Sequence, residues 1–298
     1  MSRPLPQPET RSFDLFSAVA AAVVLALVGY FGWRYFDTPA PAEAPLATAA
    51  DASPAEPAAP MPTAEVASTE PPAIENPMEA LDPAETQAAP EPLPELASSD
   101  ASVTERLSQL MGRKNVLTFL QLDGFVRRSV ATVDNLARSQ ASTTRWPVVP
   151  TPQRFTTRKS ADGVETIHPD NSRRYAPLVE LVESVDATQA VALYRGLYPL
   201  FQQAYEELGF PGRYFNDRLV QVLDHLIATP VPTAPLTVTL VEVKGTVASL
   251  RPWVRYELAD PVLESMSAGR KILLRVGPEQ QRRLQAKLVE LRRLVAKP

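Results

Sequence analysis

The sequence lacks cysteine and contains only two histidines, His168 and His225, and 11 glycines among its 298 residues. Without cysteine there is no disulfide framework, no thiolate nucleophile and no cysteine-ligated zinc or iron–sulfur site. Two histidines are too few for a three-histidine zinc site. The sequence also has no P-loop, GxGxxG, GxSxG or HExxH motif. We therefore expect no metal, no cofactor and no motif-based catalytic site.

Basic residues are scarce in the N-terminal third of the chain. Residues 1–100 contain 3 Lys and Arg against 15 Asp and Glu, whereas residues 101–298 contain 27 against 19. The two net charges, minus 12 and plus 8, sum to the formal charge of minus 4. The near-neutral total therefore conceals an acidic arm joined to a basic body.

The longest uncharged run covers residues 15–33, starting at Leu15 and ending at Trp33. As a helix it would span about 28 Å, close to the thickness of a hydrocarbon core of about 30 Å. Aromatic side chains, which favour the membrane interface, gather at its C-terminal end: Tyr30, Trp33, Tyr35 and Phe36. A cleaved signal peptide is the alternative, but its apolar core usually has about 7 to 15 residues. We predict an uncleaved transmembrane anchor over residues 15–36.

The charges beside this run predict its orientation. Arg3 and Arg11 precede it, whereas Arg34 follows it and the next basic residue is Arg106. Positive flanks stay in the cytoplasm. We therefore expect residues 1–14 to be a cytoplasmic tail and the remainder to be exported. In a bacterium with two membranes, this describes a single-pass inner-membrane protein with a periplasmic domain.

An acidic spacer is expected over residues 37–100. Residues 38–100 contain 18 Ala, 14 Pro and 12 Asp or Glu, with no Lys, Arg, Gly or aromatic residue. Such a composition buries too little apolar surface to offset the entropy of chain ordering. We predict disorder here, with a reach that approaches 200 Å at about 3.1 Å per residue.

Residues 101–298 are long enough for one folded domain, which we expect to be mainly α with a minor β component. Hydrophobic periodicity and capping residues predict helices over 105–111, 123–138, 175–183, 187–208, 217–228, 261–275 and 278–295. Asn216 is expected to cap the helix over 217–228. Strands are predicted over 236–243 and 253–258, and a hairpin around Asp162 and Gly163.

Five strings in order along this domain resemble one bacterial family. They are VATVDNLAR (130–138), NSRRYAPLVELVESVDA (171–187), YPLFQQAYEELGFP (198–211), FNDRLVQVLDHLIATP (215–230) and ADPVLESMSAGRKILLRVGP (259–278). The chain resembles domain of unknown function 3014 over about residues 101–298. The resemblance implies the architecture of that family, which carries no activity to transfer.

One polar cluster could support acid–base chemistry. Asp217, Arg218, Gln221 and His225 share one face of the predicted helix over 217–228. A hydrolase using carboxylates or His225 is therefore one functional hypothesis. The structural alternative is simpler, because an acidic residue favours a helix N-terminus and a lone histidine near an apolar stripe is usually a hydrogen-bonded boundary residue.

A second polar group lies in the predicted helix over 261–275. Asp260 with Glu264, and Lys271 with Arg275, are spaced four apart, with acids early and bases late in the helix. We predict two surface pairs here. The helix dipole accounts for this pattern without a ligand.

The last predicted helix is the best candidate contact surface. It carries a basic set comprising Arg282, Arg283, Lys287, Arg292 and Arg293. This surface could bind an anionic envelope polymer, lipid headgroups or another protein, or could be only a solvated face. We do not expect nucleic acid, because no aromatic residue is interleaved with these cations. The leading hypothesis is a membrane-anchored envelope protein with a binding or scaffold domain, and the alternative is the hydrolase.

Overall fold

The computed structural model describes residues 73–78, 93–141, 145–242 and 252–296. The predicted anchor over residues 15–36 lies outside these ranges. Within the described residues, none of the helices combines the length and apolar character needed to cross a membrane.

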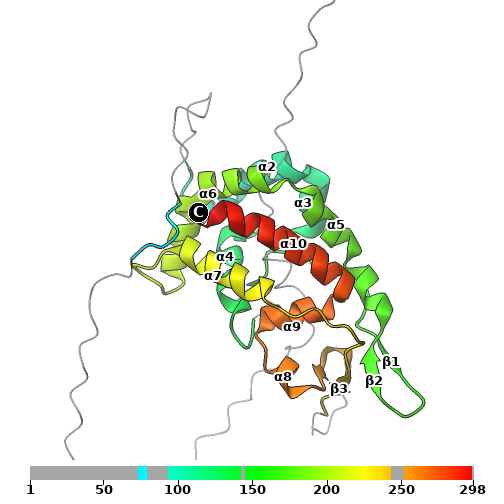
Figure 1. The fold of residues 1–298 in the computed structure, drawn as a ribbon. Helices are drawn as coiled ribbons and strands as arrows, with labels where there is room; N and C mark the ends of the chain where they lie inside the picture. The colour runs from blue at the N-terminus through cyan, green and yellow to red at the C-terminus, as the bar shows by residue number, and fades with distance from the viewer. Residues whose placement is uncertain (1–72, 79–92, 142–144, 243–251, 297–298) are drawn as a thin grey trace, which may run out of the picture.

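The described part of the chain is mainly helical with a small β component, which confirms the predicted class (Figure 1). Its α-helices are α2 (Asp100–Met111), α3 (Arg113–Phe119), α4 (Phe125–Leu136), α5 (Ala176–Ser184), α6 (Ala187–Glu207), α7 (Phe215–Ile227), α8 (Pro261–Glu264), α9 (Ala268–Arg275) and α10 (Pro278–Val295). Its 3-10 helices are η1 (Leu96–Ser98), η3 (Pro169–Arg174) and η4 (Pro252–Val254). Its strands are β1 (Thr157–Lys159), β2 (Glu165–Ile167), β3 (Val238–Leu240) and β4 (Tyr256–Leu258).

The strands form two short antiparallel pairs. β1 pairs with β2 around Gly163, which confirms the predicted hairpin. β3 pairs with β4. The two pairs meet where Ile167 N–H donates to the Leu236 carbonyl at 3.0 Å, and they lie together at one end of the domain (Figure 1).

Two long helices form the centre of the helical part. α6 packs against α4, α7 and α10, and α10 also packs against α5 (Figure 1). The apolar stripe of α10 is buried and comprises Leu284, Leu288, Leu291 and Val295. Burial of each such side chain is worth about 1.5–3 kcal/mol. This stripe therefore holds α10 in the core. Of the basic set, Arg282 and Arg293 are exposed, whereas Lys287 is buried.

The predicted helix over 261–275 is two helices, because the chain breaks between Glu264 and Ala268. Ser267 caps α9 by accepting a hydrogen bond from Arg270 N–H. Ala268 N–H donates to the Arg138 carbonyl at 2.7 Å, a tertiary bond that a continuous helix would lack. Serine favours a cap over a helix interior because its hydroxyl competes for backbone donors.

The folded part begins earlier than the expected boundary at residue 101. Leu96 is buried in the main core, Leu93 packs against that core, and α2 starts at Asp100. Composition assigned these residues to the spacer because the apolar pair is embedded in Pro, Ala and acidic residues. Burial of the apolar surface of Leu93 and Leu96 in the core stabilises the short stretch that contains them.

The N-terminus of α7 also differs from the prediction. Tyr214 occupies the N-cap position, and Asn216 lies one residue inside the helix with its side chain fully buried. The side chain of Asn216 therefore does not cap α7. Its amide is used in tertiary hydrogen bonds instead.

Candidate functional site

A short segment of the acidic spacer lies against the N-terminal end of α7. This docked segment comprises residues 73–78 and is separated from the folded domain by residues 79–92 (Figure 1, cyan). The Asp217 carboxylate receives three of its donors. Oδ2 accepts from Glu75 N–H at 3.2 Å, and Oδ1 accepts from Asn76 N–H at 2.6 Å and from Asn76 Nδ2 at 3.1 Å. Asp217 therefore binds both the backbone and the side chain of the segment.

Two further side chains complete the contact. The Asn216 amide donates to the Asn76 carbonyl at 2.9 Å and to the Val295 carbonyl at 2.8 Å. Tyr214 Oη accepts from Met78 N–H at 2.7 Å. Met78 also packs its side chain against the main core. Asn216, Asp217 and Tyr214 together form what we call the α7 docking site.

Buried tyrosines support this site from below. Tyr194 donates to Asn216 Oδ1 at 3.4 Å, and Tyr198 accepts from Asn216 N–H at 3.3 Å. Tyr198 in turn donates to Gln202 Oε1 at 3.1 Å. Burial raises the pKa of both tyrosines, because a charged phenolate would lose its hydration in the interior. Both hydroxyls therefore stay protonated at physiological pH, and they hold Asn216 at its side chain (Tyr194) and at its backbone (Tyr198).

The docked segment was not singled out from the sequence, although a signal exists. Asn76 is the only asparagine and Ile74 the only isoleucine within residues 38–100. The sequence Ile-Glu-Asn-Pro-Met therefore interrupts a stretch built from Ala, Pro and acids. A short change of composition of this kind, within the otherwise uniform acidic spacer, is typical of a recognition motif.

The residues of the predicted polar cluster contact three different parts of the chain: α4, the docked segment and the start of α9. Arg218 donates to Asp134 Oδ1 at 3.0 Å and so holds α7 against α4, and it donates to Gln221 Oε1 at 2.6 Å within α7. Asp134 is buried and also accepts from Arg138 at 2.6 Å. Asp217 binds the docked segment. The structure thus brings Arg218 and Gln221 together but directs Asp217 to a different surface.

His225 lies near the other end of α7. Its Nε2 is 2.7 Å from Ser267 Oγ, and the pair borders a shallow depression with Met266 and Arg270. Burial lowers the pKa of His225, with a further lowering from the positive charges of Arg270 and Arg218. Asp217 and His225 are eight residues apart, or about 12 Å along the helix. Among the described residues no carboxylate bonds to the imidazole, so the pair resembles a catalytic dyad without the acid that usually orients it.

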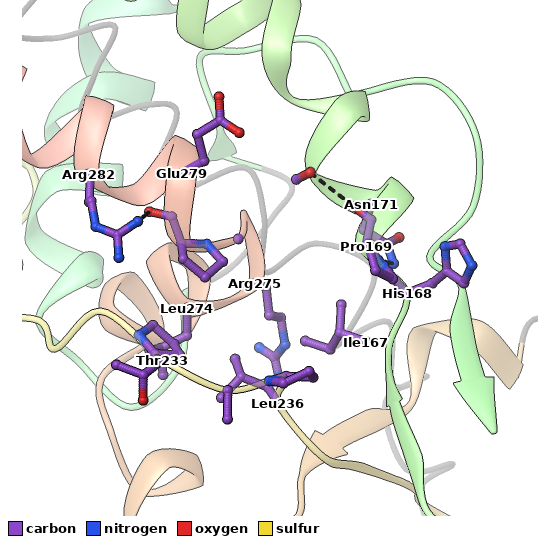
Figure 2. Close-up of a pocket in the computed structure, with 16 residues that line it drawn as sticks. Ile167, His168, Pro169, Asn171, Thr233, Leu236, Leu274, Arg275, Glu279 and Arg282 are labelled. Atoms are coloured by element: carbon purple, nitrogen blue, oxygen red, sulfur yellow. Dashed lines mark hydrogen bonds between the residues drawn. The ribbon is translucent and has the colours of Figure 1, made fainter. Parts of the chain in front are cut away.

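A second pocket lies where the hairpins meet the start of α10 (Figure 2). Its volume is about 440 Å³, and its walls include Ile167, Leu236 and Leu274. Figure 2 shows the Arg275 side chain running toward Leu236 and Ile167, whereas the Arg282 guanidinium turns back to the Pro278 carbonyl.

The two predicted surface pairs, Asp260 with Glu264 and Lys271 with Arg275, are wrong. Lys271 and Arg275 are buried and both face Glu264, at 2.7 Å and 3.6 Å. Glu264 Oε2 also accepts from Leu258 N–H at 2.8 Å. Asp260 instead accepts from Val262 N–H as the N-cap of α8. The break between α8 and α9 explains the difference, because the chain turns there and brings Glu264 of α8 against Lys271 and Arg275 of α9.

The basic face of α10 is largely paired with neighbouring helices. Arg283 binds Glu183 of α5 and Arg292 binds Asp224 of α7, while Lys287 bonds to Glu290 at 2.8 Å. Hydrogen bonds from Arg283 lower the pKa of Glu183. Of the five predicted contact residues, Arg282 and Arg293 have no carboxylate partner among the described residues. The acids on α5 and α7 were not visible as partners in the sequence of α10 alone.

No metal site is found in the part of the chain that the structure covers, where no three acidic or histidine side chains gather. Searches of curated proteins and of solved structures returned no match. One family model does match, over residues 125–292, and its description is "Protein of unknown function (DUF3014)". The match covers 168 of 298 residues, more than half of the sequence. The chain therefore belongs to the DUF3014 family, as the five sequence strings indicated.

Proposed function

We propose that this chain is a membrane-anchored protein of the bacterial cell envelope whose folded domain is a binding module for a protein partner. The observation that carries the proposal is the α7 docking site. Three side chains there bind a bent peptide segment through its backbone as well as one side chain. Backbone hydrogen bonds provide affinity for a peptide segment, and a side-chain contact provides specificity.

The anchor and its orientation are supported by the sequence alone. Residues 15–33 are uncharged, and Arg3 and Arg11 lie before them. A periplasm-active reporter fused after residue 298 should be active, and a cytoplasm-active reporter at the same position should be silent. The reverse pattern would contradict the exported location of the domain.

A protein partner is favoured over an anionic polymer or a lipid surface. The basic face of α10 would serve such anions, but Arg283, Lys287 and Arg292 already bind carboxylates. Binding an anion there would require breaking these pairs. At the α7 docking site a partner would replace the docked segment, and the side chains of the site would keep the positions in which they already bind a peptide.

Site-specific photocrosslinking of the full chain in cells tests the binding module. A photoreactive residue at Arg213, which is exposed beside Tyr214, should capture a discrete protein. Asp217→Ala should abolish that product. Lys159, exposed on the distant hairpin, is the matched control position and should give no such product. Identical products from both positions, or a product insensitive to Asp217→Ala, would contradict the proposal.

A hydrolase is the second candidate function, and the contact between Ser267 and His225 at 2.7 Å favours it. A neutral imidazole at that distance can accept the hydroxyl proton of a nucleophile. Against it, Ser267 Oγ also accepts from Arg270 N–H as the cap of α9. A serine-reactive fluorophosphonate should therefore leave the chain unlabelled, and labelling that Ser267→Ala removes would support the hydrolase.

A further inference from the structure

We propose that residues 73–78 are a built-in competitor for the α7 docking site, and that the partner is bound there through a segment of the same chemistry, asparagine followed by proline and a large apolar residue. The inference rests on the proposed binding function. It adds the kind of segment that the site accepts. It also adds a form of regulation, because the site is free for a partner when residues 73–78 leave it.

The hydrogen bonds define what the site selects. The N–H groups of Glu75, Asn76 and Met78 all donate to the site, and the one intervening residue is Pro77, which has no N–H. Proline therefore fits the position at which no acceptor is provided, and it also favours the extended backbone of the residue before it.

The side chain of Asn76 is selected by charge and by donor capacity. Its Nδ2 donates to Asp217 Oδ1, while the backbone carbonyl of Asn76 accepts from Asn216 Nδ2. Aspartate at this position would place a second carboxylate against Asp217, and alanine would leave the carboxylate one donor short. The apolar residue after proline is selected differently, because Met78 packs against the edge of the core.

The docked segment is held by few contacts, so a partner can displace it. Ile74 is 55% exposed, and Glu75 and Pro77 are also exposed. Only Asn76 and Met78 insert their side chains partly into the surface. The segment buries too little to be a permanent part of the core.

Proximity gives this weak segment an advantage over a free ligand. Only the fourteen residues 79–92 separate Met78 from Leu93. A connection of that length gives a local concentration of roughly millimolar. We therefore expect the segment to weaken the binding of an equivalent free peptide on the order of tenfold.

The test measures binding of a fluorescein-labelled synthetic peptide with the sequence PPAIENPMEA, residues 71–80, to the purified full chain by fluorescence anisotropy. Asn76→Ala in the chain removes the competitor and leaves the site intact. It should bind the peptide on the order of tenfold more tightly than the wild-type chain. Ile74→Ala is the matched control in the same segment and should behave as wild type, since Ile74 is mostly exposed.

Specificity is tested with the same chains. The peptide in which Asn76 is replaced by alanine should not compete, and the double variant Asn76→Ala with Asp217→Ala should bind neither peptide. Circular dichroism of every variant should retain the wild-type helical signal, which separates loss of binding from loss of folding. Absence of peptide binding to Asn76→Ala, or equal binding of both peptides, would overturn the inference.

The remaining outcomes separate this inference from the proposed function. Equal peptide affinity of the wild-type and Asn76→Ala chains would contradict the competitor role. Dimers that disappear on Asn76→Ala would mean that the segment docks onto a second copy, which also contradicts it. If the peptide binds as expected but no cellular product forms from position 213, the partner-binding function fails while competition within the chain stands. If that product forms in cells but the peptide does not bind, the module stands and the proposed partner chemistry is wrong.

Discussion

The two ends of α7 carry polar groups that are used in opposite ways. At the N-terminal end, Asn216 and Asp217 reach out to a segment about 140 positions earlier in the chain. At the C-terminal end, His225 contacts Ser267, which caps α9 of the same folded domain. The N-terminal end is therefore a recognition surface, which we call the recognition end. The C-terminal end joins α7 to α9 through the contact between His225 and Ser267, and we call this contact the joint. The residue types alone do not distinguish them, because both ends read as candidate acid–base groups.

Helix electrostatics contribute to this division. The N-terminus of a helix carries partial positive charge, which stabilises the Asp217 carboxylate while its oxygens remain available to external donors. The C-terminus would favour a charged histidine. Burial and the two neighbouring arginines act against that charge and lower the pKa of His225. The joint is therefore built around a neutral ring.

The largest expected effect comes from breaking the joint. A Cβ added at Gly269 of α9 would lie 2.6 Å from Leu226 Cδ2 and 2.8 Å from the Leu136 carbonyl. Gly269→Ala should lower the free energy of unfolding by about 2–3 kcal/mol, because α9 must move away from α4 and α7. Urea unfolding of the full chain, followed by circular dichroism, measures this loss.

Gly196→Ala in α6 is the matched control for that substitution. A Cβ at Gly196 would meet nothing within 4 Å, and the residue lies in a helix interior. We expect this variant to be stabilised by about 0.5–1 kcal/mol. Equal destabilisation of both variants would contradict the close packing assigned to Gly269.

The next effect comes from breaking the recognition end. Asn216 is fully buried and donates to Val295 as well as to the docked segment. Asn216→Ala should lower the free energy of unfolding by about 2 kcal/mol, because two carbonyls lose their donor and a small cavity forms. Amide hydrogen exchange at residues 75, 76 and 78 should accelerate in the same variant. Unchanged exchange would show that the segment does not depend on Asn216.

The secondary structure of this domain was more predictable than its polar contacts. Apolar periodicity predicted α4, α6 and α10 closely, because buried apolar residues recur at helical spacing along each of them. The break at Ser267 was missed because its cause is tertiary, a bond from Ala268 N–H to the Arg138 carbonyl. Asp217 was identified as a candidate, but its partner lies 141 positions away at Asn76. Local spacing carries no information about contacts at that separation.

A smaller effect is expected from removing the hydroxyl of the joint. Ser267→Ala should lower the free energy of unfolding by about 1 kcal/mol, since α9 loses its N-cap and His225 loses its partner. Thermal unfolding of the full chain measures the loss. Ser265→Ala is the matched control, because among the residues that the structure describes its hydroxyl bonds to the Val262 carbonyl alone, within its own turn. A Ser267→Ala chain as stable as that control would mean that the hydroxyl is not structural, which would favour the hydrolase.

The smallest effect is a dependence of stability on pH through His225. Burial, then Arg270 and Arg218, lower its pKa below the ordinary value of 6.5, so the unfolded chain binds a proton more readily than the folded one. Above about pH 7 the residue is neutral in both states and contributes no slope. As the pH falls below 6.5, only the unfolded state gains the proton at first, so wild-type stability should decline until the folded pKa is passed. The difference in unfolding free energy between the wild-type chain and His225→Gln, measured from pH 7.5 to pH 5, should shift steadily in favour of the variant. A shift in favour of the wild type would mean that the charged ring is stabilised in the folded domain, and both ends of α7 would then hold charged groups.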